Sequence, residues 1–289
     1  MPDDVDLSAT EAREAATFAT LMGAAHARQA AAMGQAAPTP RFLLDGARSM
    51  AMHLGMTAER MQDQLAPMAL WQLHLPSELG KRQWDFDAVR AEMPASYEIV
   101  RRALAMLDAQ PQLVTTVFHM PAFPILCTLI GAAWRAMHDG PLHALIASRN
   151  MGWLRLGNNR WILDAISPIG TDPAGLRTLM AGLRNGSIRR LLILADGPQA
   201  PGPAGIRALD GISPALGIRT TLLSKIRTLG IPILPITHEW TGDRLTVRPR
   251  PVLDGSDAAA IDAVVRLVEE LLRRHPEQWL NWSAARIRT

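Results

Sequence analysis

The stretch QLVTTVFHMPAFPILCTLIGAAW, residues Gln112–Trp134, decides the fold. It opens with a β-branched apolar run from Leu113 to Phe118, which predicts a buried strand, and after His119 it becomes an apolar run of helical length. Open α/β sheets place their chemistry where such a strand ends and a helix begins. His119 therefore has two interpretations, a functional histidine or a core residue that closes the strand.

The segments after this stretch repeat the alternation of strand and helix. Further strands are predicted over 142–147, 189–195, 231–236 and 245–250. Helices are predicted over 88–108, 123–138, 173–184 and 220–229 and from Ser256 onward, while 198–205 is predicted as loop. This order predicts an α/β fold with a mainly parallel central sheet flanked by helices. Residues 1–40 are predicted to be a helical N-terminal extension and residues 41–289 one α/β domain.

The composition and net charge limit the kinds of partner that this protein is expected to bind. The 289 residues carry a net charge of +3 and a pI of about 9.7, which weakly favours anionic partners such as phosphates, a carrier protein or an anionic lipid surface. The arginines are scattered and not interleaved with aromatic residues, so we expect no nucleic-acid partner. Cys127 is the only cysteine, which excludes an internal disulfide, and its apolar helical surroundings predict a buried thiol.

Membrane and export signals are not expected. The first residues are acidic and polar where a secretory signal would be basic and then apolar. Only Gln112–Trp134 has the length of a membrane span, and its prolines, its histidine and its β-branched first half favour a strand, a turn and a helix instead. We therefore expect a cytoplasmic protein without a transmembrane segment, at most peripheral at the inner membrane.

Three predicted strands end in polar residues, namely His119, Arg149 and Asp196. Because the carboxyl ends of parallel strands meet at one edge, these side chains are expected to line one crevice. Histidine can act as a general base, arginine can bind a phosphate or an oxyanion, and aspartate can orient either. No histidine pair has the spacing of a helical zinc site and no P-loop is present, so neither a metal nor a nucleotide cofactor is predicted.

Several segments carry a resemblance to one family. These are HPEQWLNWSAARIRT at 275–289, ADGPQAPG at 195–202 followed by GIRALDGISPALG at 205–217, and TLGIPILPITHEW at 228–240 with LTVRPRPVL at 245–253. In order and spacing they resemble the bacterial lipid A late acyltransferases (lauroyl/myristoyl transferases), within the lysophospholipid acyltransferase superfamily. The C-terminal segment is similar to the family's closing signature, and the resemblance runs from about residue 40 to the C-terminus.

The resemblance implies transfer of an acyl group from a thioester of acyl carrier protein or coenzyme A to a hydroxyl or amine acceptor, which is a small molecule or a lipid. The thioester is the donor substrate, and no further cofactor is implied. His119 aligns with the histidine of the family's His-x4-acid motif, Arg149 with an arginine at the next strand end, and Asp196 with the strand-end aspartate. The residues expected to bind substrate in the Gly-rich segment are Gly197, Arg207 and Gly211.

The sequence departs from the family pattern at the orienting acid. The fifth residue after His119 is Pro124, and a proline cannot orient an imidazole. Three explanations stay open: another acid, Asp196 or Glu239, supplies the partner; the acceptor is an amine that needs less help from a base; or the domain only binds acyl groups or a partner protein. A thioester hydrolase would show the same sequence features.

Overall fold

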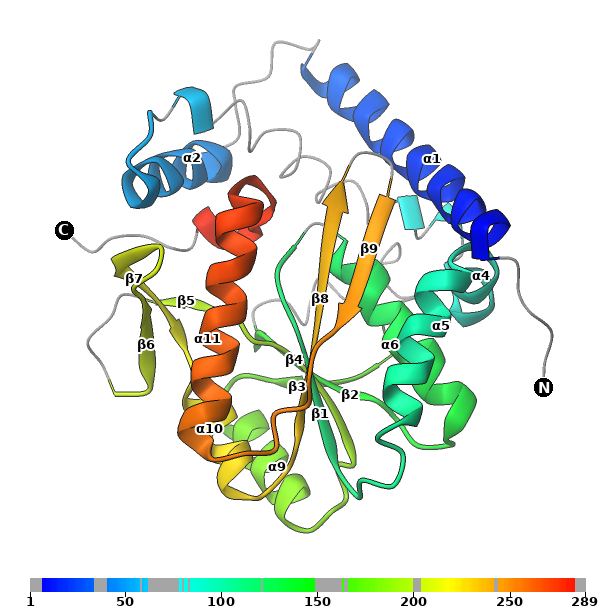
Figure 1. Cartoon of the computed structure of the whole chain (residues 1–289), viewed down its shortest axis with the longest axis vertical. Helices are drawn as coiled ribbons and strands as arrows, with labels where there is room; N and C mark the ends of the chain where they lie inside the picture. Colours follow the sequence, from blue (N-terminus) through cyan, green and yellow to red (C-terminus); the bar gives the residue numbers. More distant parts are fainter. Residues whose placement is uncertain are drawn as a thin grey trace.

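The computed structural model describes residues 7–33, 41–57, 59–61, 78–79, 81–82, 84–120, 122–148, 163, 166–199, 204–241 and 244–283. It has the predicted α/β architecture, a six-stranded sheet with helices on both sides (Figure 1). The strand order is β3-β2-β4-β1-β8-β9. The parallel strands are β1 (Leu113–Val117), β2 (His143–Ile146), β3 (Ser167–Gly170), β4 (Arg190–Leu194) and β8 (Ile233–Thr241). The edge strand β9 (Arg244–Pro249) pairs antiparallel with β8.

Apolar side chains of alternating direction give the sheet two cores. Leu113 and Val117 of β1 lie in the core beneath α1 (Leu7–Met33), α4 (Phe86–Glu92), α5 (Pro94–Ala105) and α6 (Phe123–Met137). Val114 and Phe118 lie in the opposite core, with α2 (Arg41–Leu54), α9 (Pro173–Arg184), α10 (Thr221–Thr228) and α11 (Asp257–Arg274). Figure 1 shows these two groups of helices on opposite sides of the sheet. Burying both faces is what parallel sheets require.

The structure corrects three local predictions. The helix expected over 88–108 is two helices, α4 and α5, because Pro94 lacks an amide hydrogen and begins the second one. The loop expected over 198–205 begins with a short strand, β5 (Pro198–Gln199). This strand belongs to a small antiparallel sheet of order β5-β7-β6, with β6 (Ile206–Leu209) and β7 (Ser213–Arg219). The last change is that β8 continues five residues beyond the predicted end at Ile236, since β9 pairs along this extension.

The described chain closes with two 3-10 turns after α11. These turns are η3 (Pro276–Gln278) and η4 (Leu280–Ser283), and η4 packs against α2. Within the described ranges, no helix is long and apolar enough to cross a membrane. Cys127 is buried in α6, and burial raises the pKa of its thiol to about 12. Cys127 is therefore a packing residue.

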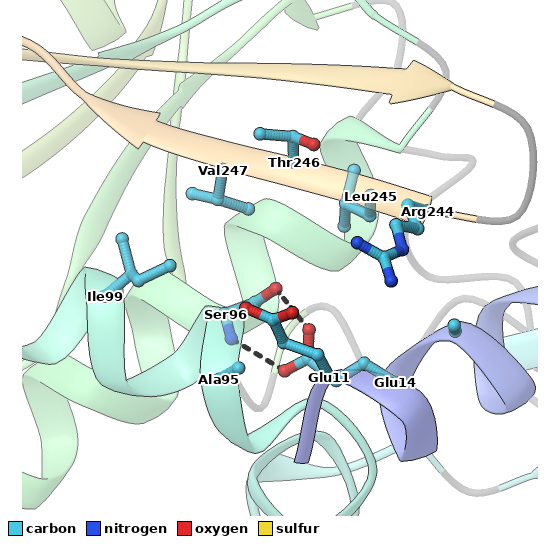
Figure 2. A pocket seen from close by; sticks show the side chains of 10 residues that line it. Glu11, Glu14, Ala95, Ser96, Ile99, Arg244, Leu245, Thr246 and Val247 are labelled. Carbon is cyan, nitrogen blue, oxygen red and sulfur yellow. Dashed lines mark hydrogen bonds between the residues drawn. The ribbon is translucent and has the colours of Figure 1, made fainter. Parts of the chain in front are cut away.

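Helix α1 is held on the domain by one buried carboxylate. Glu14 accepts hydrogen bonds from the backbone N–H of Ser96 at 2.6 Å and from its hydroxyl at 2.8 Å, in the first turn of α5 (Figure 2). Met93, the residue before α5, offers no side-chain cap, so Glu14 fills that role from another helix. Burial raises the pKa of Glu14 despite the bonds from Ser96, and the nearby charge of Glu11 raises it further.

A small hollow of about 140 Å³ lies beside this contact, between α1, α5 and β9 (Figure 2). Its lining includes Glu11, Ile99 and Arg244 but neither His119 nor Asp196. The domain boundary predicted at residue 40 stays a prediction, although Phe18 of α1 packs edge-on against Trp240 of β8.

Glu14→Ala is expected to lower the free energy of unfolding by about 1–3 kcal/mol, because it leaves two buried donors of Ser96 without their acceptor. Urea unfolding at pH 7 measures this change. Glu11→Ala is the matched control on the same helix; it removes an exposed charge that disfavours the Glu14 carboxylate and should leave stability equal or slightly higher. Equal losses in the two variants would contradict the capping role.

Candidate active site

Two of the predicted strand-end residues meet at the carboxyl edge of the sheet. Val117 at the end of β1 lies opposite Leu194 at the end of β4, so His119 and Asp196 follow at the same height on neighbouring strands. Ala195 donates its backbone N–H to the carbonyl of Val117, which continues the ladder toward the site. Because the strands are parallel, the polar side chains after them are delivered to one edge.

His119 and Asp196 are in direct contact. Nδ1 of His119 lies 2.7 Å from Oδ1 of Asp196, and the backbone N–H of His119 donates to Oδ2 at 2.8 Å. A carboxylate at Nδ1 favours the tautomer with its proton on that nitrogen and leaves Nε2 as the basic atom. The imidazole is 30% exposed whereas the side chain of Asp196 is 1% exposed, so the pair presents a base to solvent and keeps its acid covered.

The Asp196 carboxyl group is ionised at neutral pH. Burial alone would raise the pKa of Asp196, but the adjacent His119 and the hydrogen bonds from His119 and Trp279 outweigh burial. The pKa therefore lies below its ordinary value of 3.8. A charged, desolvated carboxylate can stabilise the imidazolium that forms when His119 takes up a proton.

The C-terminal turns supply the remaining contacts of Asp196. Trp279 donates from Nε1 to Oδ2 at 2.7 Å, and Asn281 donates from Nδ2 to the backbone carbonyl of Asp196 at 2.9 Å. Gln278 anchors these turns to β8, since its side-chain amide bonds both the N–H and the C=O of Trp240. The C-terminal segment that resembles a family signature therefore covers Asp196, the acid of the His119–Asp196 pair, which we call the dyad.

Pro124 occupies a place where a proline fits well. It lies in the first turn of α6, where its missing N–H breaks no helical bond, and its carbonyl accepts from the hydroxyl of Thr128 at 3.0 Å. The ring of Phe123, the residue before it, lies 5.7 Å from the ring of His119. The carboxylate beside His119 comes from the end of β4 and not from this helix.

Glu239, the other acid considered as a partner for His119, has different contacts. Its buried carboxylate lies 3.3 Å from Arg274 and 3.9 Å from both Arg248 and His275. It neutralises basic groups along β9 and the end of α11. Of the two acids, only Asp196 is in contact with His119.

The other predicted site residues are Arg149, Gly197, Arg207 and Gly211. Arg149 lies outside the described residues. Gly197 follows Asp196 directly, and a Cβ added there would meet no atom of the described residues within 4 Å. Arg207 is paired with Asp262 of α11. Gly211 donates its N–H to Glu269 of the same helix at 2.8 Å, and a Cβ there would clash with Arg273. The contacts of Arg207 and Gly211 are with α11, and the substrate-binding role of all three stays a prediction.

His238 lies on β8, the strand that pairs with β1 on the side opposite β4. The paired register of these strands ends at Thr116 opposite Pro235, and β8 continues past it to His238. Nε2 of His238 lies 3.4 Å from the carbonyl of Met120, a long hydrogen bond in which Nε2–H donates. Nδ1 has no hydrogen-bond partner within the described part of the chain, and burial lowers the pKa of His238 to about 4, so the ring is neutral.

Sequence reasoning missed three residues of this site: His238, Trp279 and Asn281. His238 is expected to be a core histidine because an apolar strand surrounds it, and its contact with Met120, the residue after His119, depends on strand pairing that the sequence pattern does not supply. Trp279 and Asn281 belong to the C-terminal segment that carries the family resemblance, and that resemblance could have marked them as candidate site residues. Nothing in that motif, however, indicates that its donors reach Asp196.

Comparison with models of known protein families found no match, and comparison with curated proteins found none either.

The buried His238 should make the protein sensitive to mild acid. When unfolded it binds a proton near pH 6.5, and when folded only near pH 4, so the unfolded state holds more protons in between. Stability attributable to His238 is therefore lost as the pH falls from 6.5 to 4, by about 3 kcal/mol in total. Asp196, with its lowered pKa, loses its contribution only at still lower pH.

Urea unfolding of the wild-type protein and of His238→Gln, from pH 7 to pH 4, measures this loss. The variant should show a shallower decline over that range, because all other groups titrate alike in the two proteins. Parallel curves would mean that His238 is not held neutral by burial.

Proposed function

We propose that this protein is an acyltransferase that moves an acyl group from a thioester donor to a hydroxyl or amine acceptor. The observation that carries the proposal is the contact of 2.7 Å between Nδ1 of His119 and a buried, ionised Asp196 at the carboxyl edge of a parallel sheet. This arrangement has the geometry of a general base with an orienting acid.

The reaction would use His119 as the base. Its Nε2 takes the proton of the acceptor O–H or N–H while the acceptor atom attacks the thioester carbonyl carbon. Asp196 accepts from Nδ1–H throughout and stabilises the imidazolium. The tetrahedral intermediate then expels the thiolate, which receives the proton from Nε2. Arg149 remains our candidate for binding the oxyanion or a donor phosphate.

The thioester donor and the family assignment rest on the sequence resemblance to lipid A late acyltransferases. Two points support them. The segment similar to the family's closing signature covers Asp196 through Trp279 and Asn281. The acid that Pro124 cannot provide is replaced by one that reaches His119 from β4. We propose acyl carrier protein or coenzyme A as the carrier and a cytoplasmic location, at the inner membrane surface when the acceptor is a lipid.

A thioester hydrolase is the second candidate, because the 30% exposure of the His119 side chain leaves the base open to water. Water in place of the acceptor would need the same base and the same carboxylate. The third candidate is a protein that binds acyl thioesters without turnover. Such a protein would need neither His119 nor Asp196 for binding.

Thiol release from a panel of acyl thioesters, with and without candidate alcohols and amines, tests the proposal. His119→Ala should abolish acceptor-dependent release. Asp196→Asn should lower it by up to roughly 10^4-fold, the loss seen when an orienting aspartate is made neutral in another enzyme class. Glu239→Gln is the matched control, because it neutralises a buried carboxylate that contacts basic groups and not His119, and it should keep its activity.

Release that needs no acceptor would assign the hydrolase instead. Thioester binding without release would assign the binding protein. Equal losses in Asp196→Asn and Glu239→Gln would contradict the dyad.

A further inference from the structure

Both oxygens of the Asp196 carboxylate have defined donors. Among the described residues, the donor facing Oδ1 is Nδ1 of His119, while Oδ2 accepts from the backbone N–H of His119 at 2.8 Å and from Nε1 of Trp279 at 2.7 Å. The two donors on Oδ2 fix the plane of the carboxylate. With that plane fixed, Oδ1 is directed at the imidazole.

Trp279 is itself rigidly placed. It is 2% exposed, and its ring packs edge-on against Trp282 with centroids 4.8 Å apart. The preceding residue, Gln278, is bonded to both backbone groups of Trp240 on β8. The indole N–H therefore comes from a turn that is anchored to the sheet beside the dyad.

We propose that Trp279 is a positioning residue for the dyad, which orients the Asp196 carboxylate and sets how strongly it holds the proton on His119. This inference rests on the proposed function. Trp279 touches no reacting atom and acts only through Asp196.

The physical basis is competition for the charge of one carboxylate. A donor to Oδ2 draws negative charge away from Oδ1, so Oδ1 binds the imidazolium less strongly and the dyad releases its proton at lower pH. Without the indole N–H, Oδ2 keeps only the backbone N–H of His119 as a donor in the part of the chain that the structure describes, so the carboxylate is held less firmly and its charge concentrates toward the imidazole. The dyad then holds its proton to higher pH, and the base is both less well oriented and less available.

Trp279→Phe removes the N–H and keeps an aromatic ring in place. We expect kcat for acyl transfer to fall about tenfold, the factor for one lost hydrogen bond to a charged group, with KM for the donor little changed. The acid limb of the pH–rate profile should move to higher pH. Trp282→Phe is the matched control, because its N–H donates to the carbonyl of Pro276 and not to the dyad.

A second readout needs no turnover. Diethyl pyrocarbonate modifies the unprotonated imidazole, and His119 is exposed enough to react. Peptide mass spectrometry of His119 modification across pH then reports where the dyad loses its proton. That midpoint should move upward in Trp279→Phe and stay in place in Trp282→Phe. If Trp279→Phe does not fold, replacement of Trp279 by benzothienylalanine, which carries sulfur in place of the N–H, gives the same comparison.

An unchanged midpoint in the folded Trp279 variant would overturn the positioning role even if His119→Ala abolishes acyl transfer. A shifted midpoint in a protein that transfers no acyl group would support the role of Trp279 and count against the proposed function.

Discussion

The carboxylate of Asp196 is buried, so its charge must be stabilised by hydrogen bonds or an ion pair within the protein. This requirement constrains the fold around it. Its compensation comes from the turn after β1, through His119, and from the C-terminal turns, through Trp279. These donors come from distant parts of the chain, 77 and 83 residues away from Asp196. The site is therefore complete only when the sheet has formed and the C-terminal turns have closed over it.

Dependence on Asp196 also explains how the chain tolerates Pro124. An acid on α6 would have to reach His119 from the helix that follows it, whereas Asp196 reaches it from the neighbouring strand at the same height. Parallel pairing of β1 with β4 fixes that height, so the contact does not depend on the first residues of α6. The first turn of α6 is then free to accept a proline and to bury it in the helical layer.

The fold class could be predicted because it depends on local patterns. The β-branched run at Leu113 and the amphipathic helix after Ser256 carry their periodicity in a few adjacent residues. The strands β6 and β7 escaped prediction because neither carries a clear alternation of apolar and polar residues, and β7 contains a Pro and a Gly; their pairing with each other, not their pattern, makes them strands. The break at Pro94 is visible in the sequence as a proline inside a helical pattern.

The candidate site was predictable only in part. His119 and Asp196 could be assigned to one edge, because residues after parallel strands gather there. Their contact could not be derived, since Glu239 stayed open beside Asp196 as the acid partner of His119 until the side-chain positions were known. His238 and Trp279 depend on strand register and on the path of the C-terminal turns, which no local pattern encodes.

The measurement that bears most directly on this account is the tautomer of His119 at neutral pH, read from its imidazole ¹⁵N resonances by NMR. The account predicts a proton on Nδ1, shared with Asp196, and an unprotonated Nε2 facing solvent. A proton on Nε2 with a bare Nδ1 would contradict it, because a histidine in that state is not oriented by Asp196 and cannot serve as the base.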